Sequence, residues 1–349
     1  MLRFDKLRGV AHIDIADPWQ AIEACYERGW TDGLPVVPPT APLVEAMLGA
    51  GPWSGDEMLL DEPARGRRVS AYKAAVNAVM AGCLPSYFPV VGATLKAMSE
   101  PQYSLHAIAA STGGAGTLVI VNGPIRHRLG VHSGANLFGP GFRANATIGR
   151  AVRLVMLNGL DATPGVLDKS TQGWPGKYSA CFAEDEETSP WEPLHVSRGY
   201  DAGQSTVTIF AAESGHNLLN HASSAPEQLL TTFTDSMAAF GSFSNGRSVV
   251  VIAPEHMLHL ERAGWSREQV QEFLYENTWR SLADLRRGGK IEDGSQLADG
   301  DETARVHRGQ GPDDYLVLVG GGTAGGHSMF FPSWSRSRGA SFVTREIPT

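Results

Sequence analysis

Four short apolar runs, rich in β-branched residues, constrain the fold of this chain more than any other feature. They are 117–121, 206–211, 248–253 and 315–319. Nearly continuous runs of this kind are typical of strands that are buried on both faces. A helical pattern lies between each successive pair of runs, at 145–158, 224–240 and 266–277. Strands that alternate with helices predict βαβ units, and therefore an α/β fold with a mixed or mainly parallel sheet flanked by helices.

Capping signals mark where these three helices are expected to begin. Asn145 is the predicted N-cap of the first helix. Ser224 with Glu227, and Ser266 with Gln269, match the capping-box pattern at the start of the other two.

The first third of the chain is predicted to be mainly helical. Asp17 and Pro18 have the pattern of an N-cap followed by a first-turn proline, and two further helices are expected at 70–81 and 89–98. The predicted lobes are a mainly helical one over 1–110 and an α/β one over 111–349 that carries most of the site. One continuous domain is the alternative, because no clear linker separates the two.

Composition and charge exclude several classes of protein. The 349-residue chain has a formal net charge of -8 and no block of like charges, so we expect no nucleic-acid partner. It has no run of about 18 apolar residues, and its start lacks an apolar signal core, which predicts a cytoplasmic protein without a membrane role. Three cysteines without CxxC spacing indicate reduced thiols. No dinucleotide fingerprint is present, so no nucleotide cofactor is expected. Because α/β chains of this size are often homodimers, a second copy is a candidate partner.

Histidines follow three of the four predicted strands. His216, His256 and His327 each come shortly after a strand end. In open α/β sheets, ligands bind beyond the carboxyl ends of the strands. Imidazoles gathered there suit one divalent transition metal ion, with Glu213 or Glu255 as an additional carboxylate ligand. Histidines that act without metal, as acid–base or substrate-orienting groups, are the equally weighted alternative.

Two further histidines lie close in sequence to these three. His221 follows five residues after His216, and His259 lies one helical turn after His256 and is interpreted as a surface residue. The predicted centre does not include either of them.

Polar and glycine-rich turns supply candidate substrate-binding groups. The stretch 320–326 follows a strand, as phosphate-cradling loops do, and allows a carboxylate or phosphate to approach the backbone closely. A second stretch, 133–147, places an arginine beside a helix N-terminus, which favours carboxylate recognition. The predicted substrate-binding residues in and beside these turns are Asn122, Asn136, Arg143, Gly321, Gly322 and Ser328.

One cysteine and one glutamate complete the predicted catalytic set. Cys83 lies between helix-breaking residues and is a candidate nucleophile, whereas Cys25 and Cys181 are predicted core residues. Glu184 and Glu187 belong to an acidic run, 184–187, and a tryptophan and two prolines stiffen the segment that follows it. Either glutamate is therefore a candidate general acid or base, and Glu187 is assigned to the catalytic set. A solvated acidic turn is the alternative interpretation.

Five motifs spread over nearly the whole chain form a recognisable set. They are 31–35 (TDGLP), 81–85 (AGCLP), 136–147, 189–195 (SPWEPLH) and 254–256 (PEH). Together they resemble motifs of bacterial proteins associated with the UGSC (seleno)protein group. The Sec-Gly-Ser-Cys or Cys-Gly-Ser-Cys motif of that group does not occur here, so its redox chemistry is not implied. Glycine occupies position 326, where the resemblance implies a lysine before His327. The resemblance therefore implies a shared site more than a named reaction.

The leading hypothesis is an enzyme that acts on a small, polar, carboxylate-bearing molecule by lyase or hydrolase chemistry. The three histidines form its catalytic or metal centre, and Arg143 and Asn136 hold the substrate. One alternative is a thiol redox component that works through Cys83 with a partner protein. Another is a metal- or ligand-binding protein without catalysis.

Overall fold

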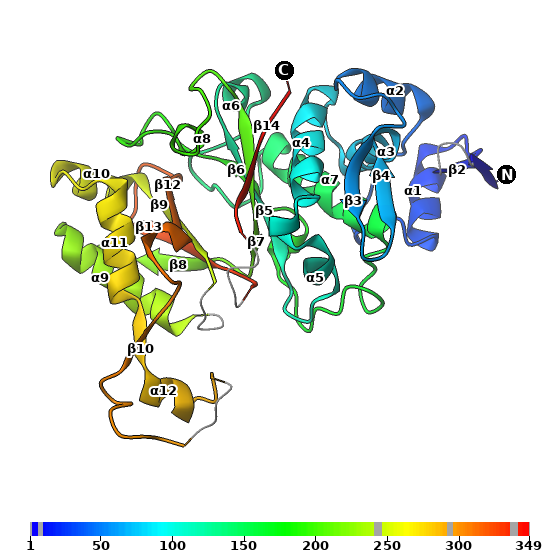
Figure 1. Cartoon of the computed structure of the whole chain (residues 1–349). Coiled ribbons are helices and arrows are strands. Elements are labelled where there is room, and N and C mark those ends of the chain that lie inside the picture. Colours follow the sequence, from blue (N-terminus) through cyan, green and yellow to red (C-terminus); the bar gives the residue numbers. More distant parts are fainter. Residues whose placement is uncertain (1, 6–9, 241–245, 292–295, 336–340, 349) are drawn as a thin grey trace.

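In the computed structural model, two four-stranded sheets pack face to face between two layers of helices. From right to left, Figure 1 shows one layer of helices, the two sheets and the other layer of helices. The structure describes residues 2–5, 10–240, 246–291, 296–335 and 341–348. None of the helices in these ranges is both long and apolar enough to cross a membrane.

The first sheet has the strand order β14-β7-β5-β6. Its strands are β5 (Gly116–Asn122), β6 (Cys181–Ala183), β7 (Thr206–Ala212) and β14 (Val343–Glu346). The central strand β5 runs parallel to β6 and antiparallel to β7. The second sheet has the order β12-β9-β13-β8. Its strands are β8 (His216–Leu219), β9 (Ser248–Ile252), β12 (Tyr315–Val319) and β13 (His327–Pro332). Here β9 and β12 are parallel, and β13 is antiparallel to both β9 and β8.

The side chains of each strand point alternately to two different cores, one on each side of the sheet. Val119 of β5 faces a core built with the helices α3 (Ala71–Ala81), α4 (Phe88–Met98) and α7 (Arg143–Leu160). Its neighbour Leu118 points the other way and shares a core with Val249 of β9. Successive residues of a strand point to opposite faces, so β5 and β9, which lie between a helix layer and the other sheet, need apolar residues at consecutive positions.

Three helices cover the outer face of the second sheet. They are α9 (Pro226–Ala239), α10 (Pro254–Arg262) and α11 (Arg267–Asn277). Val250 and Ile252 of β9 pack into the core beneath them. The helices of this layer and of the opposite layer therefore lie outermost, with both sheets buried between them.

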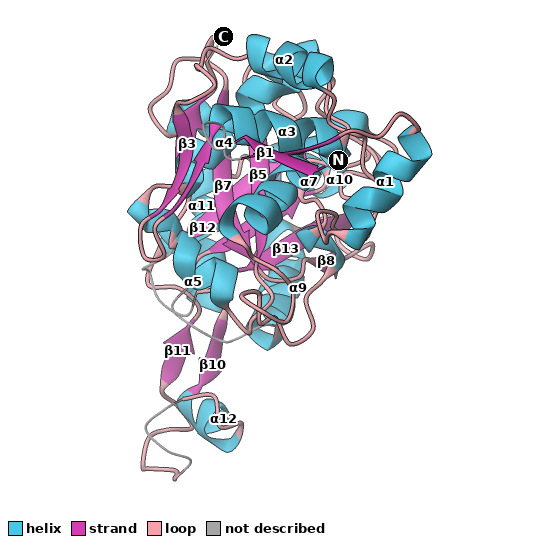
Figure 2. Ribbon diagram, turned by 90° about the vertical axis from the view of Figure 1, so that its right-hand side faces the viewer, coloured by secondary structure: helices cyan, strands magenta, loops and turns pink. Residues whose placement is uncertain are grey.

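The remaining elements extend or connect these layers. In the first 110 residues they are β1 (Leu2–Asp5), β2 (Val10–Ile13), α1 (Pro18–Glu27), α2 (Ala41–Gly49), β3 (Met58–Glu62), β4 (Arg67–Ser70), the 3₁₀ helices η1 (Pro85–Tyr87) and η2 (Pro101–Tyr103), and α5 (Leu105–Ala110). Further along they are α6 (Ile125–Leu129), η3 (Pro175–Lys177), α8 (Leu194–Ser197), β10 (Trp279–Ser281), α12 (Leu282–Arg287), β11 (Arg305–His307) and η4 (Pro312–Asp314). Figure 2 shows β10, β11 and α12 projecting away from the sheets.

The predicted fold class is confirmed: mixed sheets flanked by helices. Each of the four apolar runs forms a strand, and Asp17 caps α1 as predicted. The first 110 residues also contain four short strands that the sequence patterns did not indicate. The core that α3 and α4 build continues into α7 and the first sheet, and the division at residue 110 stays a prediction.

Two of the predicted helix starts are wrong. The helix α7 begins before Asn145, whose side chain instead accepts a hydrogen bond from the His132 N–H and donates one to the His132 carbonyl. The helix α9 has Ala225 as its N-cap and no side-chain cap, so the expected capping box of Ser224 and Glu227 does not form. The capping box of α11 is confirmed.

Candidate functional site

The pairing of β8 with β13 decides which of the predicted histidines lie together. His327 lies opposite Leu219, and Asn217 lies opposite Met329. Because cross-strand partners share a face and neighbours alternate, Asn217 and His327 lie on one face of the sheet. His216 lies on the other face, with Leu218, which belongs to the core beneath α9. The alternation thus separates two of the three predicted histidines.

His327 pairs instead with His221, which follows β8. The two Nε2 atoms are 3.3 Å apart. On the far side of His221, the backbone N–H of Gly326 donates to Nδ1 at 3.3 Å. On the far side of His327, Nδ1 lies 3.1 Å from Nδ2 and 3.3 Å from Oδ1 of Asn217. Four residues therefore form one continuous chain of hydrogen bonds.

The backbone N–H of Gly326, at one end of this chain of hydrogen bonds, determines which ring nitrogens carry a proton. A backbone N–H can only donate, so Nδ1 of His221 is the acceptor and its Nε2 carries the hydrogen in the neutral ring. Nε2 of His327 then accepts from His221, and Nδ1 of His327 donates to the side-chain amide of Asn217, whose oxygen must take the nearer of its two positions. The lone pair of His327 Nε2 is consequently the basic position of the pair.

A cavity of about 290 Å³ lies beside His327, between the end of the second sheet and the turn 136–139. The predicted site residues that line it are Asn136, Gly321, Gly322, His327 and Ser328. The structure therefore brings five of the predicted residues to one small cavity.

Backbone amides form part of the wall of this cavity. The lining residues Gly322 and Ala324 have N–H groups that make no hydrogen bond within the described parts of the chain. A Cβ on Gly322 would lie 3.2 Å from the Cβ of Ala135, which leaves little space for a side chain there. Unpaired backbone N–H groups that are close together attract an anion such as a carboxylate. The predicted glycine-rich loop thus has the features of an anion-binding segment.

Asn136 shapes this cavity rather than presenting its amide to it. Its backbone is in the left-handed region, with φ 60°. Its Nδ2 donates to the Pro140 carbonyl at 2.8 Å. A Cβ at position 139 would lie 2.0 Å from Oδ1 of Asn136, so only glycine fits beside it.

His256 is buried and both of its ring nitrogens are occupied. Nδ1 lies 2.7 Å from Oγ of Ser328, and Nε2 lies 2.9 Å from the Asn220 carbonyl. Burial lowers the pKa of His256, which favours the neutral ring. Ser328 Oγ also accepts a hydrogen bond from the Ala253 N–H. His256 and Ser328 thus join α10 to β13 and support the cavity from behind.

No side chain fits at position 326, where the resemblance implies a lysine. A Cβ there would lie 2.2 Å from the Asn220 oxygen and 2.6 Å from Nε2 of His256. The backbone N–H of the preceding residue, Gly325, donates to Oε2 of Glu255 at 2.6 Å. The other oxygen of this carboxylate, Oε1, lies 3.9 Å from Nδ1 of His221. The chain therefore has a backbone N–H and a nearby carboxylate where that resemblance implies a cation.

The other members of the predicted metal set lie elsewhere. The ring of His216 stacks on Phe240 with centroids 3.5 Å apart, and burial lowers its pKa. Glu213 lines a different cavity, of about 390 Å³, with Trp174. In the described parts of the chain, no group of three or more His, Cys, Asp or Glu side chains is placed to hold a metal ion. The structure thus does not bring His216, His256, His327 and Glu213 together.

Cys83 and Arg143 meet at the junction of α3 with α7. Sγ of Cys83 donates to the Thr147 carbonyl at 3.2 Å, and burial raises the pKa of this thiol to about 12. Arg143 donates two hydrogen bonds, of 3.1 and 2.9 Å, to the Gly82 carbonyl. Neither residue lines the cavity beside His327.

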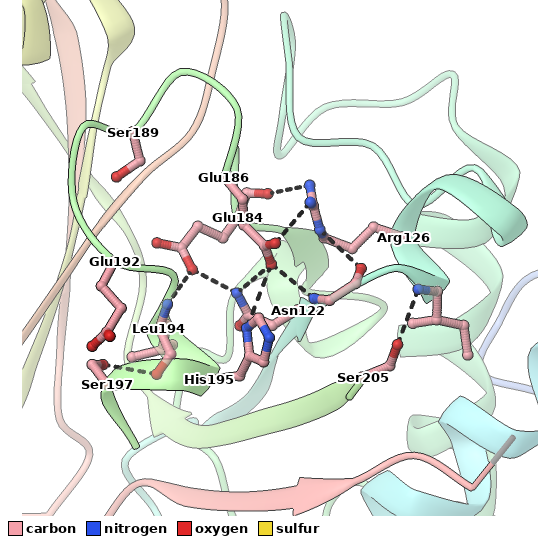
Figure 3. Close-up of polar contacts among 12 residues, drawn as sticks. Asn122, Arg126, Glu184, Glu186, Ser189, Glu192, Leu194, His195, Ser197 and Ser205 are labelled. Atoms are coloured by element: carbon pink, nitrogen blue, oxygen red, sulfur yellow. Dashed lines mark hydrogen bonds and ion pairs between the residues drawn. The ribbon is translucent and has the colours of Figure 1, made fainter. Parts of the chain in front are cut away.

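Asn122 belongs to a second polar cluster, at the carboxyl ends of β5 and β6 (Figure 3), and Glu187 joins this cluster through Arg126. The buried Nδ2 of Asn122 donates to Glu184 at 2.5 Å and to Glu186 at 2.9 Å. Arg126 binds both Glu186 and Glu187. Its hydrogen bonds to Glu187 hold the pKa of that carboxyl at about 2. Glu187 is therefore ionised and paired, unlike a general acid.

Sequence reasoning proposed Asn122, Glu184 and Glu187 for the site but missed Arg126 and His195, both of which are buried in this cluster. His195 is 1% exposed, and neither ring nitrogen has a hydrogen-bond partner within the described residues. Its Nδ1 lies 3.8 Å from Oε1 of Glu186. Glu184 is fully buried, and burial raises its pKa to about 7. An isolated histidine and arginine in the sequence carry no signal that they will meet at one sheet edge.

Comparison with known proteins adds no relative. No protein-family model, curated protein or solved structure matches this chain. The resemblance to proteins associated with the UGSC group therefore stays a prediction from the five motifs.

Proposed function

We propose that this protein is an enzyme that acts on a small carboxylate-bearing molecule by acid–base chemistry, of lyase or hydrolase type, in the cavity beside His327. The hydrogen-bond chain from Gly326 through His221 and His327 to Asn217 carries this proposal. Such a chain fixes the tautomer of both rings and leaves one basic nitrogen at the cavity.

Substrate binding follows from the two walls of the cavity. The N–H groups of Gly322 and Ala324 receive the carboxylate, and the substrate atom that bears the proton then faces His327. The volume, about 290 Å³, lies at the lower end of the range of small-molecule sites and suits a compact substrate.

Proton transfer uses Nε2 of His327 as the general base. It takes a proton from the carbon next to the carboxylate, in a lyase, or from a water molecule, in a hydrolase. The long contact with His221 is replaced by the substrate, and Oδ1 of Asn217 stabilises the imidazolium through its Nδ1–H. The same proton returns to the leaving group or the product when His327 acts as the acid.

A metal-assisted reaction at the same pair is the second candidate. A tetrahedral ion with metal–nitrogen distances of about 2.0–2.1 Å separates two ligand nitrogens by about 3.3–3.4 Å, which matches the separation of the two Nε2 atoms. However, this binding requires the lone pair of His221 Nε2, and the Gly326 N–H already requires the one on Nδ1. The metal-free reading therefore explains the contacts more directly.

The three cysteines support a reducing location. Cys25, Cys83 and Cys181 are all buried and unpaired. We therefore propose a cytoplasmic enzyme with a small-molecule substrate, no nucleotide cofactor, and a second copy as candidate partner.

Exchange with solvent deuterium tests the proposal without knowing the substrate. Lactate, malate, succinate and citrate are incubated with the protein in D₂O, and proton NMR follows loss of each C–H signal and the appearance of products. We expect at least one of them to react, and His327→Gln to slow that reaction by about 100-fold or more. The matched control is His216→Gln, on the opposite face of the sheet, which should retain the rate.

An equal loss of activity in the His216 variant would overturn the proposal. No reaction with any of the four acids would overturn its lyase form, because none of these acids has a bond that a hydrolase cleaves. Dialysis against a chelator separates the two candidate mechanisms. Activity that persists supports the metal-free reaction, whereas activity restored only by Zn²⁺, with Zn²⁺ binding lost in the variant His221→Ala, supports the metal-assisted one.

A further inference from the structure

A second cavity, of about 740 Å³, lies between the loop 31–33, the helix α7 and the segment 164–178. It has more than twice the volume of the cavity beside His327 and shares no lining residue with it. Part of its wall is the motif 31–35, to which the proposed reaction assigns no role. Cavities of this size bind drug-sized ligands and cofactors.

One buried carboxylate and two cations face this cavity. Lys177 donates to both oxygens of Asp168, at 2.9 and 2.7 Å, and Arg153 donates to Asp168 at 3.0 Å. Burial alone would raise the pKa of Asp168, but the hydrogen bonds from Lys177 and Ser170 hold it at about 2. Asp168 is therefore ionised, and it neutralises only one of the two cations.

The other acidic residue at the cavity is already paired. Oδ2 and Oδ1 of Asp32 each accept a hydrogen bond of 2.8 Å from Arg150, which lies outside the lining. The charge that remains at the cavity is consequently positive.

Arg153 has the donors that an anion needs. Its Nη2 binds Asp168 and the Ala162 carbonyl, whereas Nε and Nη1 make no hydrogen bond within the described residues. Its side chain is 13% exposed, so these donors are only partly solvated. A guanidinium in such a setting binds carboxylates well.

Flat apolar groups form the rest of the wall. Trp174 and Tyr178 both line the cavity, with Pro164 and Pro175. Tyr178 is 47% exposed, although tyrosine is usually more buried in folded proteins. Aromatic side chains at a cavity favour a planar ligand, through offset or edge-to-face contacts.

We infer that this cavity is a second ligand site, which binds an aromatic carboxylate: its carboxylate on Arg153 and its ring against Trp174 and Tyr178. This site is independent of the proposed reaction at His327.

Isothermal titration with three probes tests the inference. They are naphthalene-2-carboxylate, its neutral amide, and cyclohexanecarboxylate. We expect saturable binding of the first at one site per chain, and binding at least 10-fold weaker for the amide, which lacks the charge, and for the cyclohexane acid, which lacks the aromatic ring.

Two variants locate the site. Arg153→Gln removes the donor, and Gln172→Glu places a like charge on an exposed lining residue without disturbing the core. Each should weaken binding of naphthalene-2-carboxylate about 5-fold or more. Gln20→Glu, on exposed α1, makes the same change of net charge away from the cavity and should leave the dissociation constant unchanged.

Three outcomes with the probes and the lining variants would overturn the inference. They are absence of binding, equal binding of the amide, and unchanged affinity in both lining variants. His327→Gln should leave naphthalene-2-carboxylate binding intact. Loss of binding there, with retention in Arg153→Gln, would place the ligand in the other cavity and also overturn it. Because the two cavities share no residue, the proposed reaction can fail without affecting this result.

Discussion

Glu184 shows how strongly burial changes the pKa of one carboxyl group. The carboxyl is fully buried, and Oε2 accepts hydrogen bonds from Asn122 and from the Leu194 N–H. Oε1 has no hydrogen-bond partner in the described residues, although Nη2 of Arg267 lies 3.7 Å away. Loss of hydration outweighs these contacts, so the pKa rises to about 7.

Stability should therefore depend on pH through Glu184. The folded state keeps a proton on Glu184 that the unfolded chain loses near pH 4.5, so the contribution is complete below pH 4.5 and is lost as pH rises to about 7. The loss is on the order of 3 kcal/mol. Glu184→Gln removes this dependence without changing the shape of the side chain.

Urea unfolding at pH 5, 6, 7 and 8 measures the effect. The free energy of unfolding of the variant should rise relative to that of the unsubstituted protein as pH increases. Taking the difference between the two proteins cancels the other titrating groups, such as His256. A difference that stays constant over this range would show that Glu184 is not perturbed.

At the scale of elements, the starts of α9 and α11 show that one sequence pattern has two outcomes. Both are preceded by serine with a glutamate or glutamine three residues later. In α11, Ser266 accepts from the Gln269 N–H at 3.2 Å, and the Gln269 side chain accepts from the Ser266 N–H at 2.8 Å. In α9, Pro226 is the first helical residue and Ala225 is the N-cap. Proline prefers that first position, which leaves Ser224 one residue too early to cap.

These two serines form a matched pair of tests. Ser266→Ala should lower the free energy of unfolding by about 1 kcal/mol, because the Gln269 N–H loses its partner, the Ser266 hydroxyl. Ser224→Ala should change it by less than about 0.5 kcal/mol, since Ser224 is exposed and caps nothing. Chemical denaturation of both variants measures these two changes in the free energy of unfolding. Equal losses would mean that Ser224 caps α9 after all.

At the scale of the whole molecule, the four-layer arrangement encloses all three thiols. Cys25, Cys83 and Cys181 belong to one core, between the outer helices and the first sheet. Burial raises the pKa of each, to about 12 for Cys83. A thiolate at neutral pH therefore requires opening of that core.

Thiol labelling measures this enclosure and tests the redox alternative. With Ellman's reagent at pH 7.5, the folded protein should react at least 100-fold more slowly than protein in 6 M guanidinium chloride. Cys83→Ala should retain the deuterium-exchange activity. Rapid modification of Cys83 in the folded protein, with loss of activity in the alanine variant, would favour the thiol redox hypothesis over acid–base chemistry at His327.

The sequence by itself determined the class of the fold and four of the strands in its two sheets. Apolar residues at consecutive strand positions have one stable outcome, which is burial on both faces, and the runs that form β5, β7, β9 and β12 have this pattern. Local signals also placed the starts of α1 and α11, because a cap depends on neighbours a few residues away. The glycine-rich loop at 320–326 was found for the same local reason.

Only the tertiary structure decided which side chains meet. His216 and His327 are both near strand ends, yet the register of β8 against β13 puts them on opposite faces and brings His221 to His327 instead. Register depends on pairing across more than 100 residues of chain, which no local pattern records. The same holds for Arg153 and Lys177, whose positive charge becomes a ligand site only once Asp32 is paired with Arg150. Local preference selects elements, whereas contacts between distant segments create the sites.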